Sequence, residues 1–202
     1  RPPDDVGGRQ ASWRTIEIGI RLGGSWAETL SALADSPSVD DVLWLAWLDS
    51  WAEQADFVWT YRKLGNWLLM ELNGLLHAGV ILPFFRDAAT WRTNAVDEFV
   101  RQAGLQIHPD GFQYELSAAY QGVCVSNYLW PVRLLRSAGM EVPGALTAAY
   151  RKMTDPWRAM VRPNGVVFGF QDSSSVDLGA KLRECLSEDE YGPHDRWFLD
   201  RT

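Results

Sequence analysis

Apolar residues recur at helical spacing along most of this chain, and the pattern predicts an all-α protein. The strongest signal covers residues 40–63, where one helical face carries Trp44, Leu48, Trp51, Ala55 and Val58. Further helices are expected over 66–80, 87–103, 117–137 and 144–161, and over 13–34 with an N-cap at Ser12 and a break near Gly23. Strand signals are scarce, and the best of them covers 166–170.

Two turns of similar sequence divide the second half of the chain. Pro109-Asp110-Gly111 and Pro163-Asn164-Gly165 each follow an expected helix, and the first fits a type I or II turn with glycine at a positive φ. Their spacing is a weak internal repeat of about two helices. It favours an α/α toroid, an incomplete barrel of helical hairpins with little or no β structure, or a solenoid, over a four-helix bundle. We expect a tail or linker over 1–11, the toroid-type domain over 12–172, and a polar segment leading out of the toroid over 173–202.

Composition and charge narrow the class of protein. The 202 residues are 47% apolar and 22% charged, which predicts a buried core and excludes disorder. A net charge of −7 argues against a nucleic-acid partner, and no apolar run is long enough to indicate a membrane span. The 2 cysteines and 3 scattered histidines show no metal-ligand spacing, and no nucleotide-binding motif occurs, so neither a metal nor a cofactor is expected. The 11 tryptophans suit either the core of a helical assembly or platforms for sugar rings.

A polar stripe interrupts the otherwise apolar helix expected over 66–80. Asn66, Met70, Asn73 and His77 follow one another at helical spacing on one face. Buried amides and imidazoles need partners or water. The stripe therefore indicates either a polar cleft or a set of satisfied hydrogen bonds.

Several short fragments, each uninformative alone, occur in an order and spacing that is specific. They are the segment Trp13-Arg14-Thr15-Ile16-Glu17-Ile18-Gly19-Ile20-Arg21, the helix start Gly65-Asn66-Trp67 with Glu71 and Gly74, then Gly79, Trp91, and the block Asp110-Gly111 with Glu115, Ser117 and Tyr120. On these residues the stretch 13–172 resembles the toroid domain of the heparinase II/III-like polysaccharide lyases.

The resemblance implies β-elimination at a uronic-acid residue of an acidic polysaccharide. It assigns Asn66 to neutralising the substrate carboxylate and Tyr120 to proton transfer, as base, acid or both. An amide at a helix N-terminus suits an anion, whereas a phenol of pKa about 10 needs tuning by its surroundings. Substrate contacts are expected from Trp67, Arg14, Arg21, Glu115 and His77. The polysaccharide is also anionic, so the cleft must be locally basic, and Arg62 and Lys63 join the arginines as candidates.

Simpler roles for the same residues stay open. Asn66 also fits an N-cap, Tyr120 a core tyrosine, and Glu115 a helix cap. Arg14 and Arg21 fit partners for nearby glutamates equally well.

The chain departs from the family pattern at two positions. Trp67 follows Asn66, and Gln121 follows Tyr120, where many relatives have histidine. Of the three histidines, His77 is the best candidate for a missing base, although none matches a family motif. If none of the histidines serves as the base, the base lies outside this chain or is Tyr120 alone.

Three functions remain open at this stage. A lyase is favoured, and the resemblance then implies a secreted or periplasmic protein with further β-sandwich domains as partners of this one. A non-catalytic carbohydrate-binding or scaffolding domain is the alternative that the missing histidines favour. A glycoside hydrolase would need paired carboxylates, for which Asp110 with Glu115 or Glu71 are the candidates.

Overall fold

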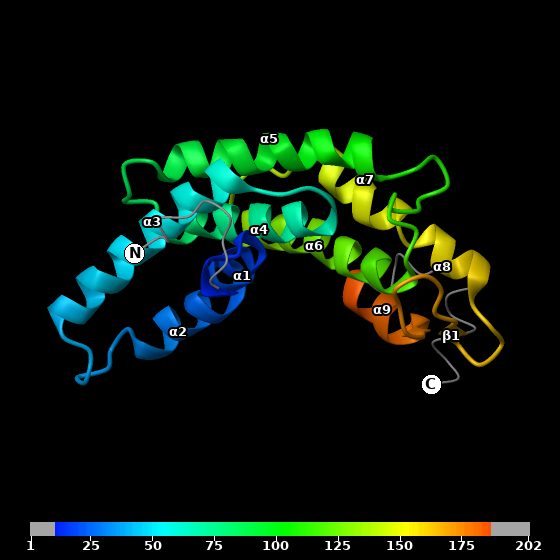
Figure 1. Cartoon of the computed structure of the whole chain (residues 1–202), viewed down its shortest axis with the longest axis horizontal. Helices are drawn as coiled ribbons and strands as arrows, with labels where there is room; N and C mark the ends of the chain where they lie inside the picture. Colours follow the sequence, from blue (N-terminus) through cyan, green and yellow to red (C-terminus); the bar gives the residue numbers. More distant parts are fainter. Residues whose placement is uncertain (1–10, 187–202) are drawn as a thin grey trace. The chain divides into compact units, whose positions relative to one another are not determined.

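The computed structural model describes residues 11–186, which fall into two compact units divided after Phe99 (Figure 1). The first unit contains η1 (Ala11–Trp13), α1 (Thr15–Ile20), η2 (Arg21–Ser25), α2 (Trp26–Leu33), α3 (Asp41–Tyr61), α4 (Gly65–Ile81) and the first part of α5 (Ala88–Gln106). The second contains the rest of α5, then α6 (Ala118–Ser137), α7 (Gly144–Lys152), α8 (Asp155–Met160), β1 (Val166–Val167), β2 (Val176–Asp177) and α9 (Leu178–Cys185).

The all-α prediction is confirmed, and the long helices lie where the apolar spacing placed them. The helices expected over 40–63, 66–80, 87–103 and 117–137 correspond to α3, α4, α5 and α6. Asp40 caps α3 by accepting a hydrogen bond from the backbone N–H of Leu43 at 2.8 Å, which satisfies one of the free donors at the helix start.

Two of the expected helices are divided. The break predicted near Gly23 is a π-helical stretch, η2, between α1 and α2. The Ser12 cap is wrong, because Ser12 lies in η1 and Arg14 is the residue that precedes α1. The single helix expected over 144–161 is two helices, α7 and α8. Pro156 lies in the first turn of α8, where its missing N–H costs no helical hydrogen bond.

The second unit also contains a pair of short strands and helix α9, of which β2 and α9 lie in the polar segment where no strand or helix was predicted. β1 is shorter than the expected strand and pairs antiparallel with β2, Val167 opposite Val176. Helix α9 packs on α6, and the hydroxyl of Ser126 on α6 donates to Glu184 on α9 at 2.9 Å. Lys181, on α9 itself, pairs with the same carboxylate at 2.9 Å. The expected tail and the end of the polar segment lie outside the described residues.

The glycines of both predicted turns have a positive φ, as expected for Gly111. Gly111 has φ of +94° and Gly165 has φ of +80°. The backbone N–H of each donates at 2.9 Å to the carbonyl three residues earlier, on His108 and Arg162.

Helices α1 and α4 cross at two glycines. A Cβ at Gly19 would lie 2.7 Å from Glu71 Cα, and one at Gly74 would lie 2.6 Å from the carbonyl oxygen of Gly19. Only residues without a side chain allow backbones to approach this closely. This contact fixes α4, and with it Asn66, against the N-terminal segment.

No helix within residues 11–186 is long and apolar enough to cross a membrane.

Candidate active site

Asn66 lies in the first turn of α4, directly after a backbone reversal. Gly65, with φ of +71°, is the first helical residue and Leu64 is the N-cap, so Asn66 is not the cap itself. Its side chain is buried, at 6% exposure. A buried amide in the first turn lies beside free backbone N–H groups, where the helix dipole favours an anion.

Arg14 and Trp67 lie together beside this helix start. The guanidinium of Arg14 is 5.0 Å from the centre of the Trp67 ring, a cation–π contact, and is 3.7 Å from the carboxylate of Glu17. Arg14 is exposed and Trp67 is half-buried. Arg14 is an exposed cation over the ring of Trp67, which is the residue after Asn66. This arrangement is suited to binding an anionic sugar.

Arg21, the other predicted arginine, is committed to internal bonds. Its guanidinium donates to the side chain of Gln54 at 2.8 Å and to the carbonyl of Ser12 at 2.8 Å. It also lies 5.5 Å from the Trp26 ring centre. Burial lowers the pKa of Arg21, against the opposing charge of Glu17. The structure therefore places Arg21 as a link between η2 and α3.

The two basic residues before α4 are held by the helices on either side of them, Arg62 by α3 and Lys63 by α4. Arg62 stacks 3.8 Å from the ring centre of Trp59 and donates to the carbonyl of that residue. The backbone N–H of Lys63 donates at 2.8 Å to Glu71, a carboxyl that is 1% exposed. Burial raises the pKa of Glu71 to about 7, partly offset by the hydroxyl of Thr15, the Lys63 N–H and the two cations. Glu71 thus anchors the loop that leads into the helix.

His77 and the polar stripe bond back to their own helix. The amide of Asn73 donates to the carbonyl of Leu69 at 3.1 Å, and Nδ1 of His77 lies 2.8 Å from the carbonyl of Asn73. Burial lowers the pKa of His77. Eleven residues of helix place His77 about 16 Å along α4 from Asn66. Asn73 and His77 therefore hydrogen-bond to the backbone of their own helix, and His77 lies far from the helix start.

Tyr120 lies in the first turn of α6, in the second unit. Ser117 caps that helix, accepting from the backbone N–H of Tyr120 at 3.3 Å. The phenol of Tyr120 is half-exposed and donates to the carboxylate of Asp172 at 2.6 Å. That hydrogen bond and the charges of Asp172 and Glu115 raise the pKa of Tyr120. Tyr120 is thus a surface phenol rather than a core tyrosine, and its surroundings favour the protonated form.

The loop before α6 is built on buried glutamines. Gln121, fully buried, donates to the carbonyls of Gly111 at 2.9 Å and Met153 at 2.7 Å, and its oxygen accepts from the backbone N–H of Gln113 at 2.7 Å. Gln113 in turn donates to Glu115 at 3.2 Å. Gln121 therefore holds the loop in place.

The carboxylates considered for hydrolysis have local partners. Asp110 accepts from the backbone N–H of Phe112 at 3.0 Å, a bond typical of a turn. Glu115 contacts Gln113, and Glu71 belongs to the other unit.

Of the other tryptophans, Trp91 is 3% exposed and donates to Asp56 at 2.8 Å, so it belongs to the core. Trp130 is 44% exposed on α6, and Trp13 packs edge-on against Phe57 at 5.1 Å.

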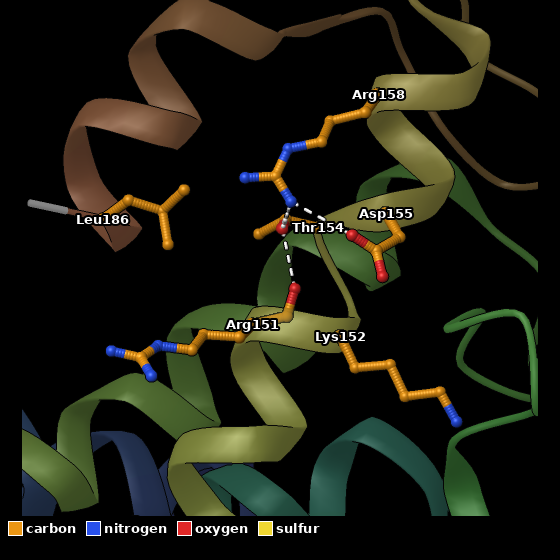
Figure 2. Close-up of a pocket in the computed structure, with 6 residues that line it drawn as sticks. All are labelled: Arg151, Lys152, Thr154, Asp155, Arg158 and Leu186. Carbon is orange, nitrogen blue, oxygen red and sulfur yellow. Dashed lines mark hydrogen bonds and ion pairs between the residues drawn. The ribbon is translucent and has the colours of Figure 1, made fainter. Parts of the chain in front are cut away.

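A basic hollow that the sequence did not predict lies at the junction of α7 and α8. It has a volume of about 390 Å³ and is lined by Arg151, Lys152, Thr154, Asp155, Arg158 and Leu186. Figure 2 shows the guanidinium of Arg158 directed to Thr154 and Asp155, which it contacts at 2.7 Å and 3.0 Å. Lys152 points away from that group (Figure 2).

Cys124 and Cys185 are buried free thiols, and no group of three metal-ligating side chains occurs within the part of the chain that the structure describes.

The helical units define a domain of the α/α-toroid type, as expected from the sequence. The family model of the heparinase II/III N-terminus matches residues 1–195. The chain belongs to this family.

Sequence relatives and solved structures agree with this assignment. A heparin-sulfate lyase of Pedobacter heparinus is 32% identical over 118 residues, 58% of this chain and 18% of the relative. That of Bacteroides thetaiotaomicron is 25% identical over 205 residues, 98% of this chain and 29% of the relative. The chain therefore spans under a third of the length of these relatives.

Two solved structures share the fold. The crystal structure of a heparinase III covers 100% of this chain with a TM-score of 0.81 at 24% identity, and the chain covers 31% of it. The heparan sulfate lyase HepC from Pedobacter heparinus covers 93% with a TM-score of 0.72 at 24% identity, and 30% of it is covered.

Proposed function

We propose that the chain is the toroid-type part of a polysaccharide lyase that cleaves a heparan-sulfate-like, uronate-containing polysaccharide by β-elimination. One observation carries the proposal: a chain matched by the family model over residues 1–195 has an amide and a phenol, Asn66 and Tyr120, in the first turns of two helices. The substrate class follows the names of the relatives, which are heparin-sulfate lyases.

Asn66 neutralises the uronate carboxylate in this proposal. The C5 proton of a uronate is weakly acidic because an ionised carboxylate resists further negative charge. A donor that bonds the carboxylate stabilises the enolate-like intermediate more than it stabilises the substrate, and only such differential binding speeds the step. Its burial and its place in the first turn of α4 support this role.

Tyr120 moves the proton. Its half-exposed phenol can meet a bound sugar, and its hydrogen bond to Asp172 fixes the direction of the O–H. The pKa of Tyr120 is raised, so the free protein holds a neutral phenol rather than a phenolate.

The first unit supplies the positive charge that an anionic polysaccharide needs within a chain of net charge −7. Arg14 lies on the face of Trp67, and Arg62 and Lys63 immediately precede the helix of Asn66. Aromatic rings flanked by cations suit sulfated and carboxylated sugars. We assign Arg14 and Trp67 to substrate binding, and Arg21, His77 and Glu115 to supporting roles given their internal bonds.

The test uses the protein at its full natural length, incubated with heparan sulfate and with other uronate polysaccharides. The ultraviolet absorbance of the unsaturated uronate product distinguishes elimination from hydrolysis. Tyr120→Phe removes one oxygen and should lower kcat by about 100-fold or more. Tyr114→Phe, which removes the same atom from an exposed tyrosine of the preceding loop, is the matched control and should retain activity.

Asn66→Asp places a carboxylate opposite that of the substrate and should raise KM and lower kcat together. Asn164→Asp, in an exposed turn, makes the same chemical change as a control. An active protein whose product is saturated would indicate a hydrolase. Polysaccharide binding without any product would indicate a carbohydrate-binding domain, and either result would overturn the lyase.

A further inference from the structure

The segment between β1 and β2 brings an acidic residue to the phenol of Tyr120 from far along the chain. Asp172 accepts the Tyr120 O–H at 2.6 Å, although 52 residues separate them. The residue before it, Gln171, has φ of +57°. A non-glycine residue in the left-handed region is uncommon and is sustained only when neighbouring contacts hold it there.

The loop is held by contacts that do not involve the Asp172 side chain. The hydroxyl of Ser117, the cap of α6, donates to the backbone carbonyl of Asp172 at 3.0 Å. Phe170 packs edge-on against Phe112 of the loop before α6, with ring centres 6.0 Å apart. The carboxylate of Asp172 is therefore delivered to Tyr120 by a scaffold that would persist without it.

The surroundings of Tyr120 make it a poor base by itself. The charged groups that act on the phenol within this unit are Asp172 and Glu115, both negative, and they raise its pKa. A phenolate is therefore scarce, and a neutral phenol takes a carbon-bound proton only if its own proton has somewhere to go. The one acceptor that the described residues place on the phenol proton is Asp172.

We propose that Asp172 is a positioning residue for the elimination, which orients the Tyr120 hydroxyl and accepts its proton as the phenol oxygen takes the C5 proton of the substrate. This inference rests on the lyase function proposed above. It adds a role for a residue of the β1–β2 segment to the two helix-start residues.

The step balances without any other reactant. The C5–H bond breaks and a new O–H bond forms on Tyr120, while the original phenol proton moves to Asp172. The C5–H electron pair becomes the C4–C5 double bond as the C4–O bond breaks. Tyr120 then gives the proton from C5 to the departing sugar oxygen, and Asp172 returns its proton to the phenol.

The test compares Asp172→Asn with the wild-type protein at its full natural length. The asparagine oxygen can still accept the Tyr120 O–H, and the Ser117 bond to the backbone is untouched, but an amide cannot take up the proton. We expect kcat to fall roughly 10- to 100-fold with KM little changed. Because Tyr120 must then ionise on its own, the activity of the variant should rise with pH into the range where a phenol titrates.

Two further variants separate charge from position. Asp172→Glu restores a carboxylate and should recover part of kcat. Asp177→Asn, at the other end of the same segment, removes the same charge from the N-cap of α9, where asparagine serves equally well. It should leave kcat unchanged.

A second readout does not depend on turnover. Phenolate absorbance, taken as the difference between each protein and its Tyr120→Phe counterpart, reports the titration of Tyr120. Removing the Asp172 charge should shift that titration to lower pH.

The outcomes distinguish this inference from the function on which it rests. An active wild-type protein whose Asp172→Asn variant keeps kcat and its pH profile would overturn the inference alone. Loss of kcat with an unaltered pH profile and an unshifted titration would show a structural role and would also overturn it. If the wild-type protein formed no unsaturated product, the proposed function would fall first and the inference with it.

Discussion

Glu71 makes the stability of the first unit depend on pH in a direction opposite to that of most carboxylates. It is 1% exposed, and burial raises its pKa from 4.5 to about 7. At a pH between those two values, Glu71 is protonated in the folded chain and ionised in the unfolded chain. Stability contributed by this group is therefore complete below the lower value and is lost as pH rises toward the upper one.

The magnitude follows from the size of the rise. A carboxyl whose pKa increases from 4.5 to about 7 on folding loses about 3 kcal/mol of stability when the pH crosses the whole window. Glu71→Gln carries a neutral group of the same shape at every pH, and its amide oxygen can accept the Lys63 N–H in place of Glu71 Oε2. The variant should match the wild type in acid and exceed its stability above neutral pH.

Urea unfolding, followed by tryptophan fluorescence at several pH values from about 5 to about 8, measures the difference between the two proteins. The difference in unfolding free energy between Glu71→Gln and the wild type should widen with pH, approaching about 3 kcal/mol. Glu28→Gln, at an exposed position on α2, is the control and should run parallel to the wild type. Parallel curves for Glu71→Gln and the wild type would refute the reasoning, because Glu71 would then ionise in the folded state as it does in the unfolded one.

Two further predictions concern packing and the buried glutamine. Gly74→Ala places a Cβ 2.6 Å from a backbone oxygen of α1 and should cost about 3 kcal/mol in a urea titration. Gly104→Ala on α5, where the added Cβ meets nothing within 4 Å, should instead gain up to about 1 kcal/mol, and equal effects of the two changes would contradict the close crossing. Gln121→Leu leaves two buried carbonyls and a backbone N–H without a partner and should lower stability by about 3 kcal/mol, read from the same titration. A variant as stable as the wild type would show that the loop before α6 does not depend on Gln121.

The sequence predicted the helices that bury a continuous apolar face and missed features that depend on distant contacts. Helices α3 to α6 are long enough for periodicity to identify them. Helix α9 has a polar sequence, and its hydrogen bond to α6 joins Glu184 to Ser126, 58 residues away along the chain, which no local pattern encodes. Pro156 is a local signal for the start of α8, but the apolar pattern continues across it and therefore predicted one helix instead of two.

The candidate site shows the same division between local and distant information. The positions of Asn66 and Tyr120 at helix starts follow from local sequence signals, a glycine as the first residue of one helix and a serine cap before the other. The partners of Arg21 and Tyr120 do not, since Gln54 and Asp172 lie 33 and 52 residues away along the chain. Spacing can place a side chain on a helix face. Only the tertiary fold determines whether that side chain is hydrogen-bonded to other residues of the protein.

The two helix starts share a way of holding their functional residue. In α4, Glu71 reaches back to the N–H of Lys63 in the loop that leads into the helix. In α6, Gln121 reaches back to Gly111 and Gln113 in its own preceding loop. In each case a buried polar group fixes the approach of the chain, so the residue in the first turn is positioned from both sides. Changes at these two buried groups should therefore alter catalysis through geometry, whereas changes at the Tyr120 partner should alter it through the proton.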